Sequence, residues 1–188
     1  MRDAAGLKNY GKALEDSFFE RENQKLLAKL REQGARERKR ATLREALKID
    51  DEDVLDRLVA LDVSPETIVA FSLVPLVEVA WADGEIQPDE REAILRAADE
   101  RGVSRSAISR QLLDSWLRRK PPAALLEVWR HYSKALLQEL DANDCRMMRE
   151  RVIGSARAVA EAAGGFLGLG SISAAEKAAL QDLELTFD

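Results

Sequence analysis

Apolar residues recur at helical spacing along almost the whole chain, and this periodicity constrains the fold more than any other feature of the sequence. No Asn-Gly or Asp-Gly turn is flanked by alternating apolar residues, which is the pattern of a β-hairpin. Aromatic residues make up only 5% of the chain, whereas alanine and leucine, which favour helices, predominate. The sequence therefore predicts an all-α protein.

Several classes of protein are excluded by the residue counts. The chain of 188 residues has one Cys and one His, which excludes an intramolecular disulfide framework, a Cys-based zinc finger and a multi-His metal site. The longest apolar run, from Ile68 to Val77, is shorter than the roughly 20 residues of a membrane span and contains Pro75. Because the segment Met1–Tyr10 lacks the apolar region of a secretory signal, we expect a cytoplasmic protein.

The net charge of −5 is distributed unevenly along the chain. Residues 1–50 contain 13 Lys and Arg against 9 Asp and Glu, whereas residues 51–188 contain 16 against 25. Acidic residues interleave with the basic ones, and no aromatic residue is available there for base stacking, so a solvated helix face is favoured over a nucleic-acid site. Contact with an anionic membrane surface stays open as an alternative. The basic excess is greatest at Arg36, Arg38, Lys39 and Arg40.

The N-terminal region is expected to be a charged helical extension, residues 1–50, that precedes a helical domain, residues 51–188. Helices are predicted from about Tyr10 to Gln33 and from Arg36 to Leu47, either as two packed helices or as one long arm, with Gly34 as the point of a break or kink. A helix with a single apolar stripe needs a partner surface, so we expect a protein partner or self-association through this region. The stripe consists of Phe18, Phe19, Leu26, Leu27 and Leu30.

Capping signals divide the rest of the chain into further helices. Ser and Asp are preferred N-caps, Pro is tolerated at the first helical position, and Gly ends helices. The predicted starts are Asp50, Ser64 (followed by Pro65), Gln87, Ser104 or Ser106, Pro122, Asp141 and Ser173. The predicted ends are near Leu61, Gly84, Gly102, Pro121 and Gly164.

Two stretches of the sequence, residues 80–90 and 168–176, resemble each other, since both contain Gly-x-Ile-x-x-x-Glu between two predicted helices. The isoleucines are expected to point inward, and the glutamates to lie in the first turn of the following helix, as in a capping box. The chain is therefore predicted to form a pseudo-symmetric helical bundle. The matching residues are Gly84, Ile86 and Glu90 in the first copy and Gly170, Ile172 and Glu176 in the second.

The first copy also matches the second half of an EF-hand calcium loop, but Val79 and Trp81 would occupy the first ligand positions and cannot bind a cation. The turn is therefore not an EF-hand. Two interpretations stay open: a helix-capping turn with solvated acids, or a loose site for calcium, magnesium or manganese. The second copy lacks the corresponding acids, which argues against a symmetric pair of sites. The candidate metal ligands are Asp83, Glu85, Asp89 and Glu90.

The segment Ala80-Trp81-Ala82-Asp83-Gly84-Glu85-Ile86, followed by Glu90, resembles the signature of TerB-like domains, the tellurite-resistance protein B family. The resemblance covers about residues 64–187. It implies an all-helical bundle with internal pseudo-symmetry, and it implies metal binding at the acidic turn through Asp83, Glu85 and Glu90. It also implies a role in bacterial stress-associated assemblies near the membrane, and no enzymatic activity.

No residue is assigned a catalytic role. His131 has no orienting acid or nucleophile nearby in the sequence, and Cys145 has no His partner. The glycine-rich segment 164–170 follows a predicted helix rather than a strand, so it does not match a dinucleotide-binding loop. Trp116, Trp129 and Tyr132 flank the Pro121-Pro122 turn, where they either staple a helical hairpin or line a ligand groove.

These observations lead to two functional hypotheses. The first is a non-enzymatic helical binding or scaffold domain with a weak divalent-cation site at the acidic turn. The second is a metal-free interaction module that dimerises through its N-terminal helices. The melting temperature in the presence of divalent cations distinguishes them.

Overall fold

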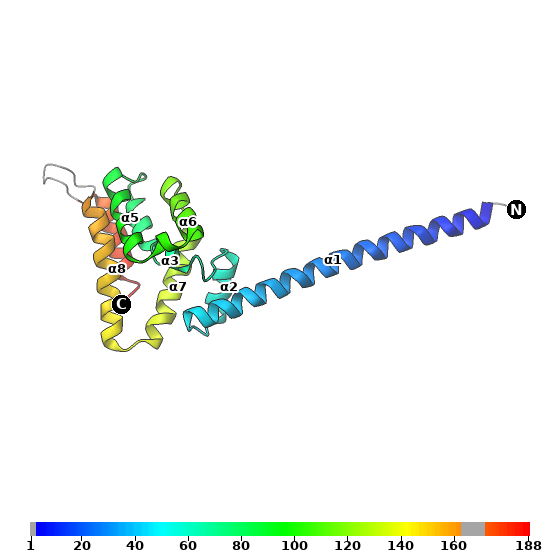
Figure 1. The fold of residues 1–188 in the computed structure, drawn as a ribbon, viewed down its shortest axis with the longest axis horizontal. Helices are drawn as coiled ribbons and strands as arrows, with labels where there is room; N and C mark the ends of the chain where they lie inside the picture. Colours follow the sequence, from blue (N-terminus) through cyan, green and yellow to red (C-terminus); the bar gives the residue numbers. More distant parts are fainter. Residues whose placement is uncertain (1–2, 163–171) are drawn as a thin grey trace. The chain divides into compact units, whose positions relative to one another are not determined.

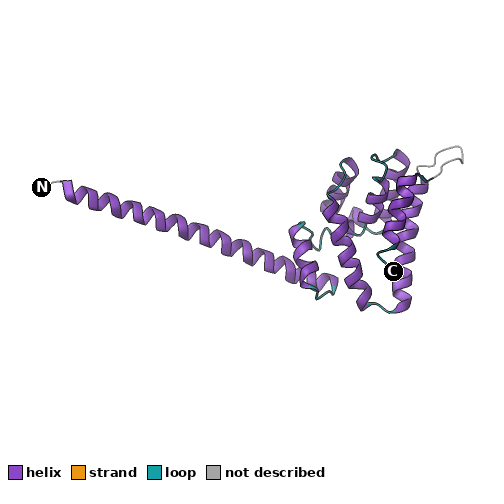
Figure 2. Ribbon diagram, turned by 180° about the vertical axis from the view of Figure 1, so that it is seen from behind, coloured by secondary structure: helices purple, strands orange, loops and turns teal. Residues whose placement is uncertain are grey.

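The computed structural model describes residues 3–162 and 172–188, with side chains from Glu20 onward. Every regular element among these residues is a helix, which confirms the predicted all-α class (Figure 2). The chain divides into two compact units, Met1–Ala41 and Thr42–Asp188. None of the described helices is both long enough and apolar enough to cross a membrane.

Helix α1 runs from Asp3 to Leu47 as one continuous helix of 45 residues (Figure 1). Of the two predicted arrangements, the structure has the single long helix, and Gly34 does not break it. A glycine inside a helix costs about 1 kcal/mol, which neighbouring ion pairs and good helix formers offset. Such pairs join Lys25 Nζ to Glu22 at 2.9 Å and Arg36 Nη2 to Glu32 at 3.2 Å. The side chains of Phe18 and Phe19, predicted for the apolar stripe, lie outside the described residues.

The next helix, α2, runs from Glu52 to Ala60, and its N-cap differs from the predicted one. Asp51 Oδ1 accepts a hydrogen bond from the backbone N–H of Val54 at 3.0 Å. Asp50 instead forms an ion pair with Arg44 at 3.2 Å. The prediction of Asp50 as the cap was therefore wrong by one residue.

The apolar run predicted as one helix beginning at Ser64 forms two short helices, α3 (Ile68–Phe71) and α4 (Val74–Ala80). Residues before α3 form a turn in which Thr67 Oγ1 accepts from the Ser64 backbone N–H at 2.8 Å. Pro75 lies in the first turn of α4 and has no N–H to donate to the preceding turn, so a continuous helix is disfavoured. The prediction of a single helix was wrong because Pro75 both interrupts and restarts it.

Capping residues further along the chain confirm several predicted boundaries. Ser106 Oγ accepts from the Ser109 N–H at 3.2 Å, and Asp141 Oδ1 accepts from the Asp144 N–H at 2.9 Å. Gly102 ends its helix with a φ of 77°, which favours glycine. The remaining elements are α5 (Pro88–Glu100), η1 (Val103–Arg105), α6 (Ala107–Arg118), α7 (Ala123–Glu139), α8 (Ala142–Ala162) and α9 (Ala174–Glu184).

Helix α4 occupies the centre of the unit Thr42–Asp188, where it contacts α5, α7, α8 and α9. Nearly all of its side chains are buried, as expected for a helix that is apolar on every face. The core of this unit also includes Leu43 and Leu47 from the last turns of α1. The end of α1 therefore belongs structurally to the helical bundle.

Candidate functional site

The acidic turn, which contains Asp83 and Glu85, joins α4 to α5. A hydrogen bond from its first residue attaches it to the rest of the bundle. Trp81 Nε1 donates a hydrogen bond to the backbone carbonyl oxygen of Trp116 at 2.9 Å. Gly84 has a φ of 106°, which side-chain-bearing residues rarely adopt, although the space around it is open. The backbone conformation, rather than packing, thus requires glycine at this position.

The four predicted metal ligands separate into an exposed group and a buried residue. Asp83, Glu85 and Asp89 are exposed, whereas Glu90 is only 1% exposed. Asp83 Oδ1 accepts from the Glu85 backbone N–H at 3.3 Å, and Glu85 Oε1 accepts from Gln87 Nε2 at 2.9 Å. The exposed carboxylates therefore stabilise the turn locally, while Glu90 points into the bundle.

Glu90 meets the equivalent glutamate of the second sequence copy, Glu176, which is 3% exposed. Each accepts a hydrogen bond from the backbone N–H that begins its own helix: Glu90 Oε2 from Gln87 at 2.7 Å and Glu176 Oε2 from Ser173 at 2.6 Å. Two helix starts that are distant in the sequence thereby bring two buried carboxyl groups together. Ile86 and Ile172 both pack, half-buried, against the core, and the symmetry of the whole repeat stays a prediction.

The environment of this carboxyl pair favours the protonated form of Glu90. Burial is the largest cause, and it raises the pKa of Glu90 to about 7. The Gln87 N–H acts in the opposite direction, whereas a hydrogen bond with Glu176 and the charges of Glu176 and Asp83 raise the pKa further. Apart from the Glu90 carboxyl group, no hydrogen-bond donor among the described residues reaches the buried Glu176 Oε1. A proton on Glu90 is therefore suited to supply a donor to this oxygen.

A metal-binding arrangement is not preformed at this turn. In the described part of the chain, no three His, Cys, Asp or Glu side chains gather into a group that could hold a metal ion. Sequence reasoning assigned Glu90 to the candidate site but missed Glu176. The matching position of the two glutamates in their repeats was the signal that could have found it.

The remaining candidate residues lie apart from the carboxyl pair. His131 is exposed, and its Nδ1 lies 2.7 Å from the carbonyl oxygen of Glu127 on the same helix. Cys145 is half-buried, with its Sγ 3.5 Å from the carbonyl oxygen of Leu137. The glycine-rich segment 164–170 lies outside the described residues.

The three aromatic residues near the Pro121-Pro122 turn have two different environments. Trp116 is buried, and its carbonyl oxygen accepts from Trp81, as in a packing role. Trp129 and Tyr132 line a cavity of about 670 Å³, and Tyr132 makes an edge contact with Phe71 at a centroid distance of 5.8 Å. Both predicted alternatives, a packing contact and a groove wall, are thus found in the same region.

Comparisons of the chain with protein-family models, with curated proteins and with solved structures found no match. The similarity to TerB-like domains therefore depends on the motif at residues 80–90 and remains a proposal.

Proposed function

We propose that this chain is a non-enzymatic helical binding module whose helix α1 docks a helix of another protein chain. The observation that supports this function best is an exposed leucine patch on α1, consisting of Leu26, Leu27 and Leu30. These side chains are 56%, 51% and 53% exposed. Leucines at this spacing share one side of a helix, which is how amphipathic helices present anchors to a partner.

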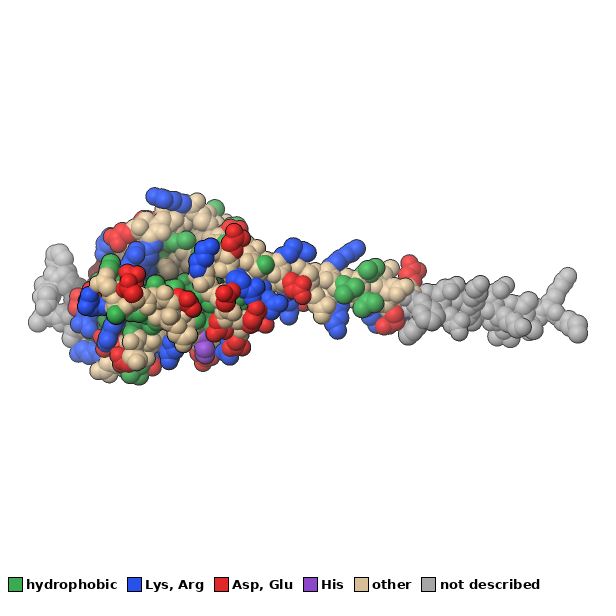
Figure 3. All heavy atoms as spheres, turned by 90° about the horizontal axis from the view of Figure 1, so that it is seen from below, with side chains coloured by type: hydrophobic (Ala, Val, Ile, Leu, Met, Phe, Trp, Pro, Cys, Tyr) green, Lys and Arg blue, Asp and Glu red, His purple; other side chains and the backbone are tan. Residues whose placement is uncertain are grey.

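The surroundings of the leucine patch suit a helix-to-helix contact. Figure 3 shows hydrophobic side chains on α1 with both basic and acidic side chains nearby. Charges of both signs beside an apolar seam select the register of a partner helix. Burying the exposed half of each leucine contributes about 1 kcal/mol, so the patch contributes about 3 kcal/mol in all, roughly a hundredfold in affinity.

The double substitution Leu26→Asp with Leu30→Asp tests the docking role. We expect it to weaken association about a hundredfold or more, because it places charge in the apolar contact, while the melting temperature of the bundle stays unchanged. Light scattering of the purified chain measures self-association, and capture from native cells measures other protein partners. Ile108→Asp, at an apolar side chain that is 57% exposed on α6, is the matched control.

A dimer that depends on the leucine patch would identify the partner as a second copy. If the double variant associates as strongly as the unmodified chain in both measurements, α1 is not the docking element.

The second proposal is that the acidic turn binds calcium, magnesium or manganese weakly. One observation favours it: the negative charge of Asp83 repels that of Glu90 and contributes to the raised pKa of the Glu90 carboxyl group. Oxygen ligands of this kind suit hard cations, and a cation would relieve the repulsion between neighbouring carboxylates. The predicted ligands Asp83, Glu85 and Asp89 are exposed and therefore accessible to a cation from solution.

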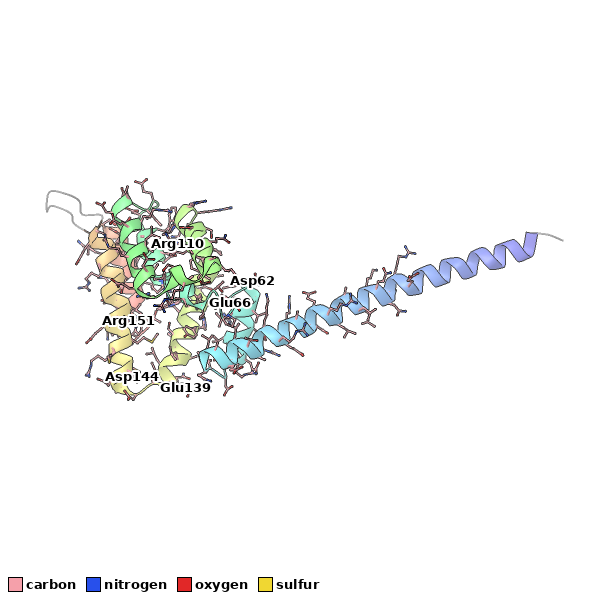
Figure 4. The ribbon with its side chains drawn as sticks, in the orientation of Figure 1. Asp62, Glu66, Arg110, Glu139, Asp144 and Arg151 are labelled. Atoms are coloured by element: carbon pink, nitrogen blue, oxygen red, sulfur yellow. The ribbon has the colours of Figure 1, made fainter. Side chains whose placement is uncertain are left out.

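For this cation site, Asp83→Asn is expected to abolish the rise in melting temperature caused by millimolar divalent cations. In the absence of metal it should stabilise the chain slightly by removing one repelling charge. Glu139→Gln, an exposed acid at the end of α7, is the control that should keep the metal response (Figure 4). An unmodified chain that shows neither heat of binding nor a thermal shift at millimolar metal contradicts the proposal.

The resemblance at residues 80–90 adds a cellular context to the first proposal. Because TerB-like domains are associated with stress, we propose that the partner of α1 belongs to a stress-associated assembly.

A further inference from the structure

A cavity of about 670 Å³ lies among α3, the end of α5, α7 and α8. This volume falls within the range of sites for small organic ligands. Its walls are mainly apolar and come from residues distant in the sequence. They include Ile68, Trp129, Tyr132, Leu136, Met148 and Val152.

Two arginines line the same cavity. Arg101 directly follows α5, and Arg151 lies midway along α8, where Figure 4 labels it. Arg101 is held in place, since its Nη1 donates to the Ser72 carbonyl oxygen at 3.0 Å and its Nη2 donates to Ser155 Oγ at 3.2 Å. A guanidinium has five N–H donors, so several remain for a ligand. Burial lowers the pKa of Arg101, and the like charge of Arg151, which lines the same cavity, lowers it further.

The charges around this arginine pair leave a positive excess. Glu100 also lines the cavity, and its carboxylate partly offsets the charge of Arg101. Neither Arg101 nor Arg151 forms an ion pair within 4 Å of an acidic side chain in residues 20–162 and 172–188. One net positive charge therefore borders a cavity whose other walls are largely apolar.

We propose that this cavity binds a single-chain amphiphile of the fatty-acid class. The hydrocarbon chain packs against Trp129, Tyr132 and Val152, and the carboxylate binds between Arg101 and Arg151. Apolar walls contribute affinity in proportion to the buried area, whereas guanidinium groups match the planar geometry of a carboxylate. A bound anion also relieves the repulsion between the two arginines.

The full-length chain titrated with the fluorescent fatty acid 11-(dansylamino)undecanoate tests this proposal. We expect saturable enhancement of the emission, reversed by dodecanoate, with dodecanol and acetate each at least about tenfold less effective. Dodecanol lacks the anionic head and acetate lacks the chain, so each removes one of the two required contacts. Absence of saturable binding, or equal displacement by dodecanol, overturns the proposal.

Variants of the cavity wall distinguish this site from adsorption elsewhere on the chain. Arg151→Gln is expected to weaken dodecanoate binding about tenfold, whereas Arg146→Gln, an exposed arginine of the same helix outside the cavity, leaves it unchanged. Val152→Phe should block binding by filling the space. Equal binding by the Arg151→Gln and Arg146→Gln variants, with Val152→Phe still binding, overturns the assignment.

Discussion

Replacing Leu43 with alanine should destabilise the unit Thr42–Asp188 by about 2–5 kcal/mol, the usual cost of such a truncation in a packed core. Leu43 is 0% exposed although it lies on the long helix α1. Leu30→Ala is the matched control, because it makes the same change on the same helix at a side chain that is 53% exposed. We expect that control to change the free energy of unfolding by less than about 0.5 kcal/mol, since alanine favours the helix. Urea denaturation of the three proteins measures the difference.

Truncations provide a second measurement of the same contribution. A chain that begins at Thr42 should unfold at the same urea concentration as the full chain, because it keeps every core residue of the bundle. A chain cut at the sequence-predicted boundary after residue 50 would lose Leu43, Leu47 and Ile49 from the core and should be strongly destabilised. Equal stability of the two truncated chains would show that the end of α1 contributes nothing to the bundle.

The predictable parts of this fold are those determined by a few neighbouring residues. At Ser106, Asp141 and Ser173 the side chain accepts a hydrogen bond from a backbone N–H three residues ahead. Asp141 and Ser173 were predicted as caps from the sequence, and Ser106 was one of two predicted alternatives. The end of α5 at Gly102 follows in the same way from backbone conformation. These boundaries depend on hydrogen bonds between residues that are close in the sequence, so they could be predicted without the tertiary structure.

Helix starts and breaks were predicted less well where two local signals compete. Pro65 and Pro75 each have the features of a residue in the first turn of a helix, but only Pro75 occupies such a position, and Pro65 precedes α3. Gly34 has the features of a helix break, yet the propensity of its neighbours outweighs it. Such outcomes depend on differences of about 1 kcal/mol that a pattern cannot resolve.

In the candidate sites too, features set by neighbouring residues were predictable from the sequence, whereas contacts between distant residues were not. The capping role of Glu176 was evident from Ser173-x-x-Glu176, but its contact with Glu90 depends on how two distant helix starts pack. Likewise, no pattern links Arg101 to Arg151, whose neighbourhood arises where α5 passes α8. Pairs of this kind come from tertiary packing, and the sequence shows only the individual members.

The buried carboxyl pair should make the stability of the bundle fall as the pH rises from about 4.5 to about 7. The pKa of Glu90 is raised from 4.5 in the unfolded chain to about 7 in the fold, so across this interval the folded state binds more protons than the unfolded state. The free energy of unfolding then decreases with pH, by at most about 1.4 kcal/mol per pH unit. Below pH 4.5 the contribution is complete, and above pH 7 it is lost.

Glu90→Gln isolates this effect, because glutamine keeps an oxygen to accept from the Gln87 N–H and carries a permanent donor to offer Glu176. We expect the stability of the variant relative to the unmodified chain to rise between pH 5 and pH 8, by up to about 3 kcal/mol. Glu85→Gln, an exposed residue of the same turn, should leave the pH dependence unchanged. Urea denaturation at several pH values measures both. If the difference between Glu90→Gln and the unmodified chain is constant with pH, Glu90 does not take up a proton in the fold, and the two capping glutamates meet as charged groups.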